Sequence, residues 1–290
     1  MLMLLPATVY VLVFNYWPMT GIVMAFQSYT FRGGIYGSPW CGLSSFRYLT
    51  ISGKLWSLTA NTLLYNLAFL LVGIVLEVAF AITLNELVGK RVKKIFQSLM
   101  FLPYFISWVV VGAIIFSLFN YEKGVVNHVL ALFGIDAVDI YNNPDYWPVL
   151  LVAIRAWKLT GYGTVIYLAA VTGLDPSMFE AASIDGANVW QRIRHITLPA
   201  LLPTMMIMFL LGIGNVFRGD FGLFYQTVGT NSNLLPKTDI IDTYVFRSLT
   251  SNSDMGMTAA AGLYQSVLCF ITITLVNSVV KRVEPDYALY

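Results

Sequence analysis

The hydrophobic positions of the chain fall into long apolar stretches that alternate with shorter polar connections. About 20 consecutive apolar residues are enough for a helix to cross the hydrocarbon core of a bilayer. Six segments reach this length, at residues 2–26, 58–84, 96–119, 146–174, 199–217 and 259–280. The pattern predicts an all-α integral membrane protein, one domain over residues 1–290 with six transmembrane helices.

Charged residues and prolines mark the less regular segments. Arg155 and Lys158 interrupt the fourth segment, which is the weakest of the six by hydropathy. Pro103 and Pro203 stand near the starts of the third and fifth segments, where a proline costs a helix least. We therefore interpret each of these segments as one span.

Composition agrees with a membrane location. Of the 290 residues, 58% are hydrophobic and 11% are charged, with a mean hydropathy of +0.71. A soluble domain carries roughly 25% charged residues. The net charge of +2 is too small to suggest a nucleic-acid partner. Cys41 and Cys269 lie far apart, and we expect neither a disulfide nor a metal site from them.

The first residues and the basic clusters predict the topology. Residues 1–13 are apolar and lack the basic start and the cleavage site of a signal peptide. We interpret them as part of the first span, with a polar leader missing from these 290 residues. Basic residues cluster in three connections, at 90–94, 192–194 and 281–282. With six spans all three lie on one side, and the positive-inside rule makes that side cytoplasmic, with both termini there.

The connection between the fourth and fifth spans, residues 175–199, carries the signals of two short helices. Asp175 followed by Pro176 is typical of a helix start, because the carboxylate caps the helix and proline suits its first position. Gly186 can end that helix with a positive backbone angle. A second helical stretch over 188–195 would then lead back to the membrane.

On the first of these helices, residues with three-and-four spacing share a face. Phe179, Ala182 and Ser183 form such a face, and the small Ala181 and Ala182 let another surface approach the backbone closely. An alternative interpretation is an amphipathic helix on the membrane surface. In that case the residues in the lipid would be Met178, Phe179, Ile184 and Trp190.

The spacing within this connection is specific. It reads Glu180-Ala181-Ala182, three residues, Gly186, nine residues, Ile196, one residue, Leu198-Pro199. This pattern resembles the EAA loop of bacterial ABC importer permeases of type I. The resemblance implies a cytoplasmic coupling helix that sits in a groove of an ATPase subunit, with an anchoring charge at Glu180 and a turn at Gly186. The predicted coupling residues are Glu180, Ala181, Ala182, Asp185, Gly186, Leu198 and Pro199.

Further motifs resemble the carbohydrate permeases, a subgroup similar to the maltose and glycerol-phosphate permeases. They are Gly37-Ser-Pro-Trp40, Asn142-Asn-Pro144, Trp157-Lys158 before Gly161-Tyr162-Gly163, and Asp239-Ile-Ile-Asp-Thr-Tyr244. The resemblance implies an oligosaccharide cargo and a location in the bacterial cytoplasmic (inner) membrane. It also implies a second homologous permease, two ATPase subunits and an extracytoplasmic solute-binding protein as partners.

Motifs of nucleotide binding and of hydrolytic enzymes are absent from the sequence. No Gly-x-x-x-x-Gly-Lys-Ser/Thr phosphate loop occurs, and neither do the His-Glu-x-x-His and Gly-x-Ser-x-Gly patterns. We therefore expect no catalytic residues, metal or cofactor in this chain, and we expect the partner ATPase subunits to bind ATP and Mg.

Charges inside a span are candidates for the translocation path because they are costly in lipid. Glu77, Arg155 and Lys158 qualify, although the two cations can instead reach an interface or pair with polar groups of a neighbouring helix. Aromatic and amide side chains suit sugar rings and hydroxyls, but Tyr and Trp also gather at membrane interfaces. The predicted path residues are Tyr65, Trp157, Lys158, Tyr162, Asn215, Tyr264 and Gln265.

The two cations of the fourth span raise the hypothesis of an acidic cargo, such as a uronic-acid oligosaccharide. A rival class is the ion-coupled secondary transporter, which requires carboxylates at mid-membrane or broken helices in repeated halves. Only Glu77 is a candidate carboxylate, and the halves show no clear repeat. A non-transporting scaffold would leave the EAA pattern unexplained.

Overall fold

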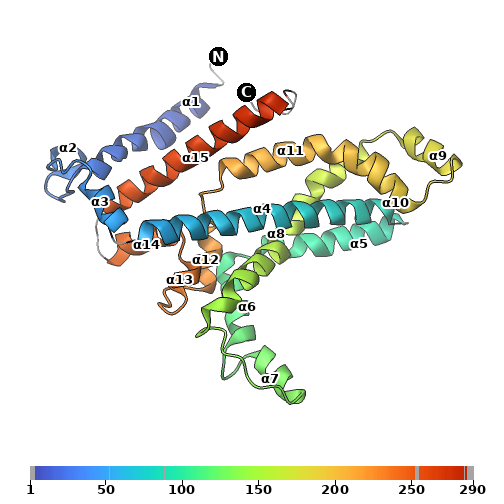
Figure 1. Ribbon diagram of the computed structural model, residues 1–290, viewed down its shortest axis with the longest axis horizontal. Helices are drawn as coiled ribbons and strands as arrows, with labels where there is room; N and C mark the ends of the chain where they lie inside the picture. Colours follow the sequence, from blue (N-terminus) through green and yellow to red (C-terminus); the bar gives the residue numbers. More distant parts are fainter. Residues whose placement is uncertain (1–3, 52, 88, 252–254, 284, 286–290) are drawn as a thin grey trace.

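The computed structural model describes residues 4–51, 53–87, 89–251, 255–283 and 285. These residues form an elongated, helical molecule in which long helices run side by side (Figure 1). Within this described part, the only β-type pairing is an isolated antiparallel bridge between Gln27 and Trp40. The all-α prediction is confirmed.

Five helical segments of the described residues are long and apolar enough to cross a membrane. They are Leu5–Phe26, Lys54–Glu86, Pro144–Thr172, Val189–Gly214 and Met255–Arg282. Each overlaps one predicted span. The main difference concerns the predicted span 199–217, the fifth of the six. Its helix begins at Val189, because the second helix of the coupling loop runs into it without interruption.

The helical geometry varies along these spans. The first comprises α1 (Leu5–Val11), a π-helical turn (Leu12–Tyr16) and a 3-10 helix (Trp17–Phe26). The second, fourth and sixth are regular, and are formed by α4 (Lys54–Glu86), α8 (Trp147–Thr172) and α15 (Met255–Val283). The fifth comprises α10 (Val189–Arg192), a π-helical segment (Ile193–Thr197) and α11 (Leu198–Gly214).

The predicted third span, 96–119, is not one continuous helix. It is divided into α5 (Lys90–Phe101), a 3-10 turn (Leu102–Phe105) and α6 (Trp108–Phe119), with a bend of 95°. With this bent pair counted as one span, the described residues have six. Pro103 has no backbone N–H with which to continue the hydrogen bonds of α5. The chain then becomes extended at Ile106 and Ser107, where ψ is 130° and 153°. Ser107 then starts α6, because its side chain accepts a hydrogen bond from the Val110 N–H at 3.3 Å.

The remaining helices are short and flank the spans. They are α2 (Gly34–Gly37), α3 (Ser44–Ile51), α7 (Val125–Leu132), a 3-10 turn (Pro144–Tyr146), α9 (Pro176–Ile184), α12 (Phe221–Thr227), α13 (Leu235–Thr238) and α14 (Ile241–Ser251). The group α12–α14 lies between the fifth and sixth spans, where the sequence predicted no structure.

Helices α4 and α8 form the most extensive helix pair, and glycines of α8 make close approaches to its neighbours. A Cβ atom on Gly161 would overlap the Met100 carbonyl of α5, and one on Gly163 would overlap the Glu77 carboxylate of α4. The absence of side chains at these two positions is therefore what lets α5 and a charged residue of α4 lie against α8.

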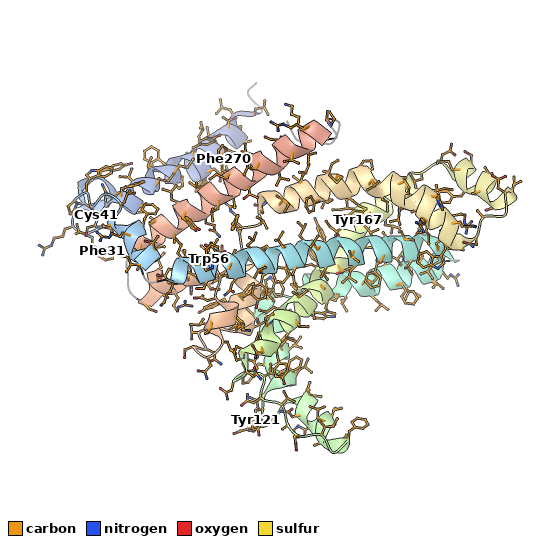
Figure 2. The ribbon with its side chains drawn as sticks, in the orientation of Figure 1. Phe31, Cys41, Trp56, Tyr121, Tyr167 and Phe270 are labelled. Carbon is orange, nitrogen blue, oxygen red and sulfur yellow. The ribbon has the colours of Figure 1, made fainter. Side chains whose placement is uncertain are left out.

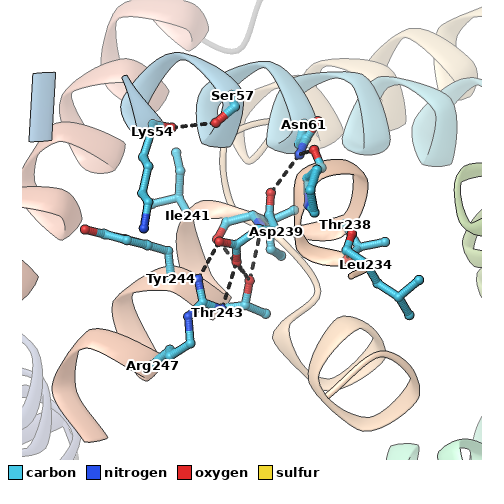
Figure 3. A network of polar contacts seen from close by, with 12 residues as sticks. Lys54, Ser57, Asn61, Leu234, Thr238, Asp239, Ile241, Thr243, Tyr244 and Arg247 are labelled. Atoms are coloured by element: carbon cyan, nitrogen blue, oxygen red, sulfur yellow. Dashed lines mark hydrogen bonds and ion pairs between the residues drawn. The ribbon is translucent and has the colours of Figure 1, made fainter. Parts of the chain in front are cut away.

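The motif Asp239–Tyr244 attaches α13 and α14 to α4 (Figure 3). The Asp239 carboxylate pairs with Arg247 at 2.5 Å and accepts a hydrogen bond from Thr243 Oγ1 at 2.8 Å. The Asp239 carbonyl accepts from Asn61 Nδ2 of α4 at 3.0 Å. This motif, recognised in the sequence by resemblance alone, thus holds the segment of α13 and α14 against α4.

The two ends of the long axis differ. Helix α9 lies at one end, together with α10 and the start of α5, whereas α2, α3 and α14 lie at the other (Figure 1). The basic residues at 90–94 and 192–194 are therefore at the α9 end. The 3-10 helix of the first span packs against α15. Both α1 and α15 have their terminal ends directed toward the α9 end (Figure 1).

Candidate functional site: the coupling loop and an intramembrane cavity

The start of α9 is fixed by its capping residue. The Asp175 side chain accepts a hydrogen bond from the Ser177 N–H at 2.9 Å, and Pro176 occupies the first helical position. Hydrogen bonds from the backbone and side chain of Ser177 hold the pKa of Asp175 below its ordinary value, because they stabilise the carboxylate. The predicted helix start is confirmed.

Gly186 ends α9 in the predicted way, with φ at +77°. The Ala187 N–H donates to the Ala182 carbonyl at 2.9 Å, and the Gly186 N–H donates to the Ser183 carbonyl at 3.2 Å. These two bonds form a complete Schellman motif, which satisfies the last carbonyls of the helix. The turn brings Asp185 and Gly186 to the exposed tip of the loop.

The second helix of the loop begins with a capping box. Asn188 Oδ1 accepts from the Gln191 N–H at 2.9 Å, and Gln191 Oε1 accepts from the Asn188 N–H at 2.8 Å. The helix then passes through the π-helical segment into α11, with Leu198 and Pro199 where α geometry resumes. Pro199 cannot donate to a carbonyl one turn earlier, which is compatible with wider turns before it.

The outward face of the coupling loop is open and partly apolar. Ile184 is 86% exposed and Trp190 is 78% exposed. Of the predicted coupling residues, Ala182 and Leu198 are half-buried and the others are exposed, namely Glu180, Ala181, Asp185, Gly186 and Pro199. On the predicted face of Phe179, Ala182 and Ser183, the first two residues are half-buried and Ser183 is exposed. A surface of this kind is typical of a protein contact.

Lys158 of α8 contacts the break in the third span. Its side chain is buried, and its ammonium donates to the carbonyls of Pro103 (3.2 Å), Tyr104 (2.9 Å) and Ile106. The ammonium also lies 5.1 Å from the centroid of the Trp108 ring. Carbonyls freed at a helix break need donors inside a membrane. Lys158 therefore pairs with a neighbouring helix, as in the alternative interpretation of the sequence.

A cavity of about 370 Å³ lies between α4, α8 and α11, and polar groups converge on it. Helix α4 contributes Asn66, Leu70, Gly73 and Glu77, which recur at helical spacing on one face. The other polar lining residues are Arg155, Tyr167, Asn215 and Arg218. Figure 2 shows Tyr167 between α11 and α4. Its hydroxyl and the Arg155 Nε are buried and have no hydrogen-bond partner among the described residues.

The charges of the cavity are not closely paired. Arg155 lies 4.7 Å above the centroid of the Phe69 ring and interacts electrostatically with Asp220 and, less strongly, with Glu77. The described residues form no ion pair with it within 4.0 Å. Arg218 is exposed at the rim. The lining of the cavity thus holds two guanidinium groups and one carboxylate, and the space can hold a polar ligand.

Three predicted path residues use their polar groups within the fold. The Tyr65 hydroxyl donates to the Lys237 carbonyl at 2.8 Å. The Tyr264 hydroxyl bonds to Thr59 Oγ1 at 3.0 Å. Gln265 Nε2 donates to the Asp242 carboxylate at 2.9 Å and to the carbonyl of Phe217 at 2.6 Å. These groups connect α13 and α15 to α4 and hold the turn after α11.

The other predicted path residues are accessible. Trp157 and Tyr162 are about half-exposed, and the Tyr162 ring stacks on Tyr104 with centroids 4.6 Å apart. Asn215 lines the cavity, as do Glu77 and Arg155. Asn66, Tyr167 and Arg218 also line the cavity and were not predicted from the sequence. The spacing of Asn66 and Glu77, eleven residues apart on one helix face, was the available signal for α4.

A bundle of membrane helices with a projecting coupling loop and a central polar cavity defines the permease class of ABC importers. The chain belongs to the family of binding-protein-dependent transport system inner membrane components, whose model matches residues 70–285. It is therefore an inner-membrane component of such a transport system, and it is a transport subunit.

Relatives cover nearly the whole chain. The polygalacturonan/rhamnogalacturonan transport system permease protein YteP of Bacillus subtilis is 33% identical, over 97% of this chain and 87% of its own. Protein LplB of the same organism is 32% identical, over 98% and 89%. The crystal structure of a bacterial ABC transporter that imports the acidic polysaccharide alginate is similar, with a TM-score of 0.89 and 29% identity over 97% of this chain and 94% of that chain. In a second structure, with a TM-score of 0.87, the alginate transporter is in complex with a periplasmic protein bound to an alginate pentasaccharide.

Proposed function

We propose that this permease imports acidic oligosaccharides, with uronate-containing fragments as the cargo. The observation that carries the proposal is the cavity between α4, α8 and α11, whose lining holds the guanidinium groups of Arg155 and Arg218 and one carboxylate, that of Glu77. A carboxylate that leaves water requires a compensating charge or several hydrogen-bond donors. The names of the relatives, which refer to polygalacturonan and alginate, support the same class of cargo.

In this proposal the chain provides half of a translocation path and hydrolyses nothing itself. A second permease completes the path, two ATPase subunits bind ATP and Mg, and an extracytoplasmic binding protein delivers the cargo. Helix α9 docks on an ATPase subunit through its exposed face, and both termini are cytoplasmic. ATP binds one arrangement of the ATPases more tightly, so it shifts the permeases between inward-open and outward-open states.

The experiment uses the whole complex in proteoliposomes together with its binding protein. ATPase stimulation is measured with oligogalacturonate and with a neutral oligosaccharide of equal length. We expect stimulation by the acidic cargo, and co-purification of ATPase subunits with the permease. Stimulation by the neutral sugar alone would exclude the acidic cargo, and a permease without ATPase subunits would favour an ion-coupled carrier.

The charge of the cavity is tested with Arg218→Gln, because this side chain is exposed and its loss leaves the core intact. We expect the half-saturating concentration of the acidic cargo to rise roughly tenfold, which corresponds to one charge-assisted hydrogen bond. Arg32→Gln is the matched control, since Arg32 is exposed in the loop before α2, away from the cavity. Equal half-saturation for both variants would contradict the role of Arg218.

A further inference from the structure

Helices α4, α8 and α11 line the cavity, but only two of them are continuous with the coupling loop. The chain runs from α8 through Leu174 into α9, and from α9 through Gly186 into α10 and α11. Helix α4 ends at Glu86 and is far from the loop in sequence. Movement of α9 therefore reaches the third wall of the cavity only through non-covalent contacts, which are the packing of α8 on α4 and any direct connection between the loop and α4.

Arg192 of α10 supplies such a connection. Its Nη2 lies 3.4 Å from Oε2 of Glu86, the last residue of α4. Its Nη1 donates to Ser183 Oγ of α9 at 3.3 Å, and that hydroxyl donates in turn to the Phe179 carbonyl at 2.7 Å. One guanidinium group thus joins α4, α9 and α10. The forked, planar shape of arginine suits this arrangement, whereas lysine offers a single point charge.

The environment of the pair indicates a positioning role. The side chains of Arg192 and Glu86 are 23% and 28% exposed, and ion pairs with this degree of solvent access contribute little to stability. Helix α4 is continuous from Glu86 back to Glu77 in the cavity, about 14 Å along the helix axis. A displacement of the end of α4 therefore reaches the cavity through a rigid element.

We propose that Arg192 is a positioning residue that links α4 to the coupling helix, so that all three walls of the cavity move with α9. This inference rests on the proposed function, in which α9 docks on an ATPase subunit. It assigns the pair of Arg192 and Glu86 to the transmission of movement.

The test is a charge exchange in the whole complex, with Arg192→Glu, Glu86→Arg and the double variant. Cargo transported per ATP hydrolysed is measured in proteoliposomes, and ATPase subunits that co-purify are quantified. We expect each single variant to lower the transport ratio roughly fivefold or more. The double variant should recover to within roughly twofold of the unchanged protein, because the pair is restored with opposite polarity.

Two further variants separate this role from contact with the ATPase. Arg194 is exposed and forms no ion pair within the described residues, so Glu86→Arg should not rescue Arg194→Glu. Ser183→Ala removes the contact of Arg192 with α9, together with the local bond of the hydroxyl to the Phe179 carbonyl one turn earlier in the same helix. We expect it to lower the transport ratio while the amount of bound ATPase stays unchanged. Normal ratios in both single variants, or no recovery in the double variant, would overturn the inference. A complex without cargo-stimulated ATPase before any substitution would instead refute the proposed function.

Discussion

At the scale of single residues, Gly186 controls the direction of the coupling loop. Its φ of +77° is a conformation that costs residues with a side chain about 1 kcal/mol or more. Its N–H also donates to the Ser183 carbonyl. Both features are needed for the Schellman motif that separates α9 from α10.

Gly186→Pro removes the N–H donor and forces φ to a negative value, so the turn cannot form. We expect loss of ATP-coupled uptake, with the membrane spans still inserted. Glu180→Lys should give the same loss through the reversed charge of the exposed helix. Uptake of labelled cargo by membrane vesicles is the measurement.

Gly37→Ala is the control for the glycine substitution, because a Cβ at Gly37 meets open space and the residue has no positive φ. This variant should transport normally. Normal uptake by Gly186→Pro would refute the role of the turn.

Lys158 and Tyr65 show what a residue type alone does not determine. Both suit a sugar-binding path by chemistry, yet the structure gives Lys158 three backbone carbonyls and Tyr65 the carbonyl of Lys237. A sequence identifies a costly polar group in a span, but its partner depends on which helix lies opposite.

At the scale of elements, the third span shows how side chains support a broken helix. At the 3-10 turn between α5 and α6, Lys158 of α8 donates to the carbonyls of Tyr104 and Ile106, and to that of Pro103, which also accepts from the Ile106 N–H. The broken conformation of the third span therefore depends on a side chain of α8 as well as on the span's own sequence.

Lys158→Met removes the three donors but keeps most of the side-chain volume. We expect destabilisation of roughly 3 kcal/mol, because buried carbonyls lose their partner. Thermal unfolding of the purified complex in detergent measures this effect, with Lys158→Arg retaining part of the stability. Lys123→Met, at an exposed position before α7, is the control. Equal unfolding temperatures for Lys158→Met and the unchanged protein would show that the ammonium does not support the break.

Hydropathy located the regular spans because long apolar runs have few alternatives in a membrane. It did not reveal the break, since residues 96–119 are mostly apolar, and the local signs were Pro103 and the capping residue Ser107. It also missed α12–α14, which are short and depend on contacts such as Asn61 with Asp239. The coupling loop was predictable in detail, because its capping residues and Gly186 act locally.

At the scale of the whole molecule, the cavity is a product of tertiary structure. Glu77, Arg155 and Arg218 come from three separate parts of the chain, and no spacing rule connects them. The sequence placed Arg218 in an outer loop, whereas the end of α11 at Gly214 brings it to the rim of the cavity. The hypothesis of an acidic cargo began with two cations of one helix. It now depends on Arg155 and Arg218, because the ammonium of Lys158 is bonded to three backbone carbonyls between α5 and α6.

The topology provides the last prediction. Helix α9 and α3 lie at opposite ends of the molecule, so they should be accessible from opposite sides of the membrane (Figure 1). Single cysteines are introduced as Ser177→Cys on α9 and Thr50→Cys on α3, both exposed positions, in a background with Cys41→Ser and Cys269→Ser. Labelling uses a membrane-impermeant maleimide on sealed spheroplasts and on inverted vesicles.

We expect Thr50→Cys to react in spheroplasts and Ser177→Cys to react only in inverted vesicles, because the basic residues at 90–94 and 192–194 lie at the α9 end. The opposite pattern would place α9 outside the cell, where no ATPase subunit can reach it, and would refute coupling through this loop. Reaction of both cysteines on one side would instead contradict the membrane orientation along the long axis. The labelling thus tests the one assumption that the coupling loop, the Arg192 connection and the cavity share: that they are arranged in sequence from the cytoplasm into the membrane.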